Sequence, residues 1–368
     1  MIFAFGKGDV MGRGGRRGTK VLAGVVAGAV LASGIGLWAT DSWPFRDSYC
    51  WGAWEQNSGA AFLGDGALGK SGSERKATAS APPLSGRPHA TCTLAVTSTV
   101  EDDDSDQPLT FHEQVTLEYG PVPAGAKERR AWIAHYFHGS ASPLPDGLDG
   151  LVARDRAMLV LPGACDADGR PAAVTLRSES TGDGHLGKVA MPFSIGTLDD
   201  VAQMLLDAAN TTMEKAGCAP GGKPLHTFSP MVTVAEDHES AGSPLCRIPG
   251  MDFDFGKGSR YEEQVGAVTD RLQTCSVVWR TLRMPDEPSA QYVMARQSRL
   301  VALFEGLPEG SAQGLLRRSC DGRPTVFYGH TETGMKDRGR PDDQRVFERF
   351  AESVGKRIGC GSGKGGDA

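Results

Sequence analysis

The 368-residue sequence has no excess of positive charge, and it lacks the motifs of the common serine and zinc hydrolases. Its 39 lysines and arginines are outnumbered by 45 aspartates and glutamates, for a net charge of −6. This excludes a protein whose main task is to neutralise nucleic-acid phosphates. The sequence also lacks a G-x-S-x-G nucleophile turn and an H-E-x-x-H motif, and it has no G-x-G-x-x-G pattern between a predicted strand and a predicted helix. These absences disfavour an enzyme, and we expect no nucleic-acid partner, no cofactor and no bound metal.

Residues 21–40 carry no charge at all, whereas residues 1–20 carry five basic side chains and one acidic one, a net charge of +4. An apolar run of about 19 residues covers about 29 Å as a helix, close to the hydrocarbon thickness of a bilayer. A basic leader before such a run is typical of a chain whose amino end stays inside. We therefore predict a cytoplasmic leader at 1–20, a single transmembrane anchor at 21–40 and an extracytoplasmic body. The alternative is a signal peptide that is cleaved.

Small residues recur at every fourth position of this apolar segment, namely at Gly24, Gly28, Ala32 and Gly36. Such a stripe lets two helix backbones approach closely in lipid, which suggests a homodimer through the membrane helix. Ten of the twenty residues at 21–40 are glycine, alanine or serine. Composition alone therefore also accounts for the stripe.

The cysteines form no C-x-x-C pair, so a zinc ribbon or a thioredoxin-like redox site lacks its shortest spacing. All eight follow the apolar segment, and an even number at wide spacing is typical of structural disulfides in an exported protein. They are Cys50, Cys92, Cys165, Cys218, Cys246, Cys275, Cys320 and Cys360.

The second half of the body repeats landmarks of the first half in the same order. Residues 91–96 resemble 274–279, and an Asp-Gly-Arg-Pro tetrapeptide follows a cysteine in each half. An Asp-Asp pair then opens a helical pattern that ends near a cysteine, again in each half. We interpret this as a duplicated module, and divide the body into a first copy at 41–220 with 55–90 flexible, a linker at 221–239, a second copy at 240–362 and a disordered tail at 363–368.

The duplication narrows the choice of disulfide pairs. Eight cysteines permit about a hundred connectivities, but only three repeat within both modules. A helix packed antiparallel to the strand after Cys165 brings its own end, and with it Cys218, back to the start of that strand. This geometry favours Cys165–Cys218 and its equivalent, so the expected set is Cys50–Cys92, Cys165–Cys218, Cys246–Cys275 and Cys320–Cys360.

Hydrophobic periodicity predicts an α+β fold. A spacing close to 3.6 residues predicts helices at 197–216 and 342–359, with Gly217 and Gly359 as left-handed caps. Alternation and β-branched residues predict strands at 91–99, 109–119, 131–137, 156–162, 172–180, 274–283, 290–297 and 324–330. Residues 298–306 are ambiguous between strand and helix. Each module is then a mostly antiparallel sheet with one long helix packed on it, stabilised by its disulfides.

One acidic run has part of a calcium-loop pattern. Asp102, Asp104, Asp106 and Glu113 take positions 1, 3, 5 and 12, but Gln107 stands where the sharp turn needs glycine. A solvated hairpin turn is the better interpretation of this run.

Two histidines, His135 and His138, could ligate zinc only if other elements supplied the remaining ligands. In the strand expected at 131–137, residues three apart face opposite sides. Structural or surface histidines are therefore the preferred interpretation.

The two halves of the body open with Tyr49-Cys50-Trp51-Gly52 and with Leu245-Cys246-Arg247-Ile248-Pro249-Gly250. Together with abundant arginine, alanine and glycine, these segments resemble single-pass envelope proteins of high-GC actinobacteria that carry a duplicated four-cysteine module. The resemblance covers most of residues 20–360. It implies a location and an architecture, and it implies no activity.

The function predicted from sequence is that of a membrane-anchored, extracytoplasmic binding protein of the cell envelope, which presents a surface to another envelope protein or to a wall component. Two copies of one module provide either a pseudo-symmetric interface or two diverged sites. The alternative is a hydrolase-like extracytoplasmic enzyme with its site between the modules. That alternative requires a cleft there with a cluster of perturbed ionisable groups.

Overall fold

A computed structural model describes residues 47–68, 73–100, 109–182, 190–232, 239–241, 244–252, 260–266, 268–279, 288–331 and 343–360. The predicted leader, the apolar segment with Gly24, Gly28, Ala32 and Gly36, and the tail at 363–368 lie outside these residues. Within the described ranges, no helix is long and apolar enough to cross a membrane.

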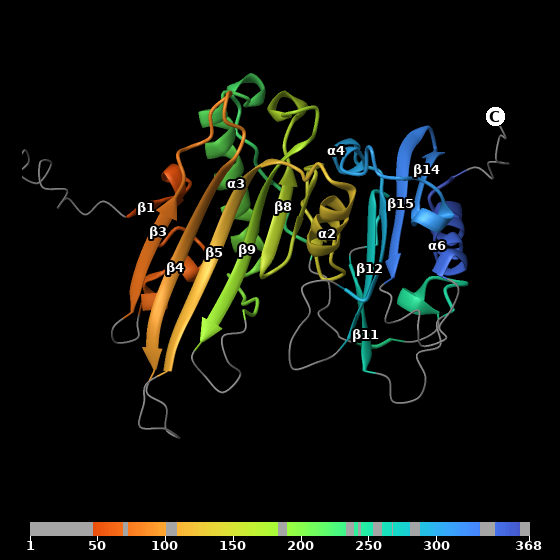
Figure 1. The fold of residues 1–368 in the computed structure, drawn as a ribbon, viewed down its shortest axis with the longest axis horizontal. Helices are drawn as coiled ribbons and strands as arrows, with labels where there is room; N and C mark the ends of the chain where they lie inside the picture. Colours follow the sequence, from red (N-terminus) through yellow and green to blue (C-terminus); the bar gives the residue numbers. More distant parts are fainter. Residues whose placement is uncertain are drawn as a thin grey trace, which may run out of the picture. The chain divides into compact units, whose positions relative to one another are not determined.

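Seven antiparallel strands form the first sheet, in the order β3-β4-β5-β9-β8-β7-β6. Their bounds are Glu74–Ala79 (β3), Ala90–Val100 (β4), Leu109–Pro121 (β5), Ser142–Pro143 (β6), Gly150–Val152 (β7), Arg156–Val160 (β8) and Ala172–Gly182 (β9). The helix α3, Leu198–Ala216, lies across one face of this sheet (Figure 1). A small separate ladder pairs β1 (Ser48–Tyr49) with β2 (Trp54–Glu55).

Six antiparallel strands form the second sheet, in the order β10-β11-β12-β13-β15-β14. Their bounds are Glu239–Ser240 (β10), Tyr261–Val265 (β11), Leu272–Trp279 (β12), Ala290–Ala295 (β13), Leu315–Cys320 (β14) and Arg323–Thr331 (β15). The helix α6, Asp343–Arg357, packs on this sheet as α3 does on the first (Figure 1). The predicted α+β class with antiparallel sheets is confirmed.

Both long helices form where the periodicity predicts them, and local signals fix their ends. Thr197 caps α3 by accepting from the backbone N–H of Asp200, whose carboxylate accepts in return from the N–H of Thr197. Gly217 ends α3 with a φ of 70°, and Gly359 follows α6 with a φ of 74°. Two shorter helices were not predicted as such: α2, Ala126–Tyr136, and α4, Ser298–Ala302.

Each long helix closes one apolar core against its sheet, as alternation along the strands requires. The core under α3 contains Leu94, Leu117 and Leu176 from the three central strands, all fully buried. The core under α6 contains Val277, Tyr292 and Phe327 from the corresponding strands of the second sheet. Burying such side chains contributes roughly 1.5–3 kcal/mol each.

A third core joins the two halves of the body, which belong to one compact unit from Ser48 onward. One sheet and one long helix per module predict a single core in each, so the shared core corrects that expectation. Its physical reason is that the second sheet is apolar on both faces: one packs on α6 and the other packs on the first half. Buried members of this shared core include Ile133, Phe137, Met158, Val160, Val293, Phe304 and Tyr328.

Polar contacts at the same junction are buried and specific. Fully buried Gln291 on β13 donates from Nε2 to the carbonyl oxygens of Ala134 and Phe137, at 3.1 and 2.9 Å. Gly139 donates its backbone N–H to Ser276 Oγ at 2.9 Å. A Cβ at Gly139 would come within 2.2 Å of the carbonyl oxygen of Gln264, so only glycine permits this approach. The junction is therefore a packed, fixed contact.

Replacing Gln291 by leucine should lower the free energy of unfolding by about 2 kcal/mol, because two carbonyl groups at the end of α2 lose their buried donor. Urea unfolding of the full chain measures this. Gln203→Leu, on the exposed side of α3, is the control and should change stability by less than about 0.5 kcal/mol. Equal effects of the two substitutions would contradict a structural role for the buried amide.

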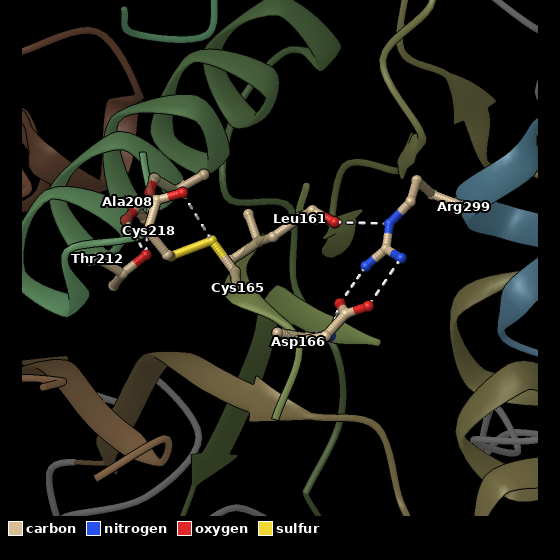
Figure 2. Close-up of a disulfide and its surroundings, with 9 residues drawn as sticks. Leu161, Cys165, Asp166, Ala208, Thr212, Cys218 and Arg299 are labelled. Carbon is tan, nitrogen blue, oxygen red and sulfur yellow. Dashed lines mark hydrogen bonds and ion pairs between the residues drawn. A yellow bond between two sulfur atoms is a disulfide. The ribbon is translucent and has the colours of Figure 1, made fainter. Parts of the chain in front are cut away.

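Four disulfides connect the cysteines in the pairs that the sequence geometry favours: Cys50–Cys92, Cys165–Cys218, Cys246–Cys275 and Cys320–Cys360. Figure 2 shows the bond from Cys165 to Cys218, just beyond the end of α3. In the same view Asp166 faces the guanidinium of Arg299 from α4, whose Nε also donates to the carbonyl of Leu161 at 2.8 Å. Such a set of bridges indicates an extracytoplasmic body.

Two local predictions are wrong. Residues 131–136, predicted as part of a strand, belong to α2, because Ile133, Tyr136 and the following Phe137 keep a helical spacing into the shared core. The segment 55–90, predicted as flexible, contains ordered structure over its described part, since Leu63 is fully buried and β3 pairs with β4. In the predicted linker 221–239, Leu225 exchanges two hydrogen bonds with the side chain of Asn210.

Candidate functional site

The face of the first sheet opposite α3 is polar. Strand alternation sends Leu94, Leu117 and Leu176 toward α3, so their neighbours in sequence face the other way. Those neighbours form cross-strand rows of threonines, amides and charged groups. The rows are Thr91–Glu118–Thr175, Thr93–Thr116–Arg177 and Ala95–Gln114–Glu179.

Helix α2 covers only the β8 end of this polar face. Its apolar residues pack into the shared core with Met158 and Val160 of β8. Tyr136 is buried on the sheet side, where its hydroxyl hydrogen-bonds with Thr175, and burial raises the pKa of Tyr136 to about 12. Trp132 stays partly buried beside it, with ring centroids 4.9 Å apart. The flank of α2 therefore forms a wall along the open part of the sheet.

Two cavities lie along this wall. The first, about 320 Å³, is lined by Trp132 of α2 and by His89, Thr91, Glu118, Arg170 and Thr175. The second, about 300 Å³, is lined by His135 of α2 and by Asp155, Arg156, Arg177 and Glu179. Both volumes stand at the lower end of the range for small-molecule sites.

A chain of ion pairs connects the two cavities. Arg177 lies 3.8 Å from the Glu118 carboxylate of the first cavity and 3.3 Å from Glu179 of the second. We call the two cavities and this connection the α2 groove. It is lined by residues 89–192, so among the described residues it belongs wholly to the first half of the body.

Gly120 makes room for His89 at the edge of the first cavity. A Cβ at Gly120 would come within 2.6 Å of Nδ1 of His89 and within 3.2 Å of the carbonyl oxygen of Pro88. The absent side chain therefore leaves the space on β5 that the His89 ring occupies.

A buried ion pair forms the floor of the second cavity. Arg156, 8% exposed, donates to the Asp155 carboxylate from both Nε and Nη2, at 2.9 and 2.6 Å, and Nη1 lies 3.2 Å from the His135 carbonyl. Burial raises the pKa of Asp155, but the charge and hydrogen bonds of Arg156, with a smaller contribution from His138, outweigh it. The pKa of Asp155 therefore lies below its ordinary value of 3.8.

This pair predicts an acid-sensitive contribution to stability. A carboxylate whose pKa is lower in the folded state stabilises the fold above pH 3.8, and the contribution is lost as the pH falls through the folded-state pKa. The free energy of unfolding of the wild type should therefore decline more steeply with acid than that of Asp155→Asn. Urea unfolding at a series of acidic pH values measures the two slopes.

The stability contribution of Asp207 should depend on pH in the opposite direction, because burial raises the pKa of Asp207. The folded state binds the additional proton here, so Asp207 costs stability as the pH rises above 3.8. Parallel pH profiles for wild type and Asp155→Asn would contradict the assigned direction at Asp155.

The two histidines singled out from sequence do lie close to this site, on α2 and just after it. His135 lines the second cavity, and its Nδ1 lies 3.2 Å from Nη1 of Arg156. His138 is 8% exposed, and its Nδ1 lies 3.3 Å from Ser140 Oγ. Among the described residues, no group of three or more His, Cys, Asp or Glu is arranged to hold a metal ion.

The acidic run of the calcium-loop pattern falls largely outside the described residues, since Asp102, Asp104 and Asp106 lie in 101–108. Glu113 is described, and it lies on β5 opposite Val96 and Ser180.

Comparison with known protein families, with curated proteins and with solved structures finds no match to the chain. The α2 groove is therefore interpreted from its own chemistry.

Sequence reasoning missed every groove residue except His135. Glu118 and Arg177 come together only through the register of β5 and β9, in which Glu118 faces Thr175. The one usable signal is alternation in 172–177, where Thr175 and Arg177 place polar side chains opposite the apolar residues Val174 and Leu176.

Proposed function

We propose that the protein is a membrane-anchored, extracytoplasmic binding protein that holds an envelope component in the α2 groove. The observation that carries this proposal is the groove itself, a recess of two cavities lined by charged, hydroxyl and apolar groups on a sheet face that α2 leaves open. Four disulfides support the extracytoplasmic location of the body. The anchor is inferred from the uncharged segment 21–40 after a basic leader.

The proposal includes a duplication, which the parallel architecture supports. The order β3-β4-β5-β9-β8 in the first sheet has the same connectivity as β11-β12-β13-β15-β14 in the second. The disulfides attach to corresponding places. One links an early turn to the second of these strands, and the other links a cysteine that precedes the fourth strand to a cysteine two or three residues after the long helix. Asp168 and Asp321 occupy the same left-handed turn position, with φ of 54° and 47°.

Under this correspondence the two copies have diverged on one face. Cys92 faces Leu117 and Cys275 faces Tyr292, so Glu118 of the groove corresponds to Val293, and Thr175 corresponds to Tyr328. Val293 and Tyr328 are fully buried in the shared core. The second module thus uses this face to hold the first, and the first keeps its own face for a ligand.

Site-specific photo-cross-linking tests the binding role. A photoreactive amino acid at Thr91, an exposed residue that lines the first cavity, is compared with one at Gln203, which is exposed on α3. In the full chain in its own membrane, we expect an envelope adduct from position 91 and none from position 203. The adduct should disappear when Glu118 and Arg177 are both alanine. Equal adducts at both positions, or none at 91, would overturn the proposal.

The anchor has its own test. The intact mass of the protein extracted from its membrane should include residues 1–40. A mature chain that begins after the apolar segment would show that this segment is a cleaved signal peptide. The protein would then be exported without a membrane anchor.

A second candidate function rests on Ser140, His138 and Asp155. The His138 ring lies 3.3 Å from Ser140 Oγ, and His138 is close enough to Asp155 to interact with it electrostatically. In a hydrolase, His138 would take the proton of the attacking Ser140 hydroxyl. Ser140 lines neither cavity of the α2 groove, so we rank this function second. Covalent labelling of Ser140 by a fluorophosphonate, lost in Ser140→Ala, tests it.

A further inference from the structure

We propose that the α2 groove takes an uncharged oligosaccharide, with one sugar ring lying on Trp132. This inference rests on the proposed binding function and assigns its ligand class. Three properties of the groove carry it: its balanced carboxylates and guanidinium groups, the indole of Trp132 and its two adjoining cavities.

The carboxylates and the guanidinium groups of the groove are matched in number and already paired. Three carboxylates and three arginines line the two cavities, together with the histidines His89 and His135. Arg177 pairs with Glu118 and Glu179, Arg156 pairs with Asp155, and Arg170 lies 3.1 Å from Asp168. A charged ligand of either sign would have to break one of these pairs or bring a like charge beside it.

Uncharged hydroxyl groups suit such a lining. A sugar hydroxyl donates to a carboxylate such as Glu118 and accepts from a guanidinium such as Arg177 without disturbing the charge balance. Hydrogen bonds to charged partners are stronger than those between neutral groups. Thr91 and Thr175 add groups that both donate and accept.

Trp132 supplies the apolar contact. Tyr136 holds it from behind at a centroid distance of 4.9 Å, and it lines the first cavity opposite Glu118 and Thr91. A flat indole surface beside the polar side chains of the cavity complements the C–H face of a pyranose ring, which is apolar while the rim of the ring carries hydroxyls. A lipid tail would leave the polar rows of the sheet unsatisfied.

The two cavities imply more than one sugar unit. They hold about 320 and 300 Å³, and Arg177 links them through Glu118. An oligosaccharide that crosses this link places successive units in the two cavities, where a monosaccharide fills only one. Binding should therefore strengthen with chain length from one unit to three or four.

Calorimetry on the full chain in detergent tests the inference with three neutral probes: chitotetraose, cellotetraose and maltotetraose. We expect at least one to bind, and its affinity to fall about tenfold or more in Trp132→Ala. Trp132→Phe should retain part of the affinity, because it keeps an aromatic face. Trp279→Ala is the matched control, because Trp279 packs edge-to-face against Tyr261 in the second sheet, with ring centroids 4.6 Å apart. This variant should bind as the wild type does.

Other outcomes overturn the inference. Binding of no neutral probe, binding only of a charged oligomer such as tetragalacturonate, or equal loss in Trp132→Ala and Trp279→Ala would each contradict it. An unchanged far-ultraviolet circular dichroism spectrum of Trp132→Ala shows that the variant is folded, so that lost binding is not lost folding. Trp132→Phe is the second variant in case Trp132→Ala does not fold. An envelope adduct from position 91 without saccharide binding would refute this inference and leave the proposed function standing.

Discussion

Replacing Cys165 and Cys218 together by alanine should lower the free energy of unfolding by about 4 kcal/mol. The bridge closes a loop with a sequence separation of 53 residues, and the entropy that it removes from the unfolded chain grows with the logarithm of loop length. It also fixes the end of α3 beside the turn that carries Asp166, so the substitution loosens the helix over the first core. Urea unfolding of the oxidised full chain measures the change.

The double variant of Cys246 and Cys275 is the control, because its loop has a separation of only 29 residues. On loop length alone, loss of this shorter bridge should lower the free energy of unfolding by about 0.5 kcal/mol less than loss of the Cys165–Cys218 bridge. Peptide mapping without reduction should also recover the link between Cys165 and Cys218. A link from Cys92 to Cys165 would contradict the pairing. An unchanged unfolding midpoint in the variant without Cys165 and Cys218 would contradict the stabilising role of this bridge.

Replacing Asp155 by leucine should lower the free energy of unfolding by about 3 kcal/mol, because it leaves the guanidinium of Arg156 buried without its carboxylate. The side chain of Arg156 is only 10% exposed, so water replaces the lost partner poorly. The measurement is urea unfolding near neutral pH, where Asp155 is ionised in the wild type.

A second variant separates the lost pair from lost packing. Asp155→Leu combined with Arg156→Met removes both charges, and it should recover most of the stability, since an apolar pair of similar volume replaces a buried ion pair at little cost. A double variant no more stable than Asp155→Leu would contradict the assignment of the effect to an uncompensated charge.

The periodic parts of the fold were predictable. Helices α3 and α6 follow long amphipathic patterns with an acidic start and a glycine end, and the strands that carry cysteines follow alternation. The disulfide pairs follow from these two elements, because a helix packed back along its strand brings Cys218 to Cys165. Because the module is predicted to occur twice, the same pattern of strand, helix and cysteines supports each inference in both halves.

Helix α2 was not predictable from its apolar run. The residues Trp132 to Phe137 are aromatic or β-branched for the most part, a composition that favours a strand. Tertiary packing decides otherwise, since a helix buries Ile133 and Phe137 in the shared core and leaves Trp132 and His135 along the groove. A short apolar run alone does not distinguish these two outcomes.

The groove itself depends on strand register, which the sequence leaves open. Glu118 and Arg177 are far apart in the chain, and they meet because β5 pairs with β9 in one register. A shift of one residue would turn Arg177 toward α3 and Leu176 toward the groove. The buried junction between the halves was not predictable either. Val293 and Tyr328 look like ordinary core residues in the sequence, and only the structure shows that they pack against the other half.

Hydrogen exchange of the full chain, with and without isolated envelope, tests the central claim most directly. If the α2 groove holds an envelope component, exchange should slow in Ala126–Tyr136 and in the facing parts of Leu109–Pro121 and Ala172–Gly182, while Asp343–Arg357 stays unchanged. Slowing confined to α6 or to the exposed side of α3, or no slowing anywhere, would contradict the account.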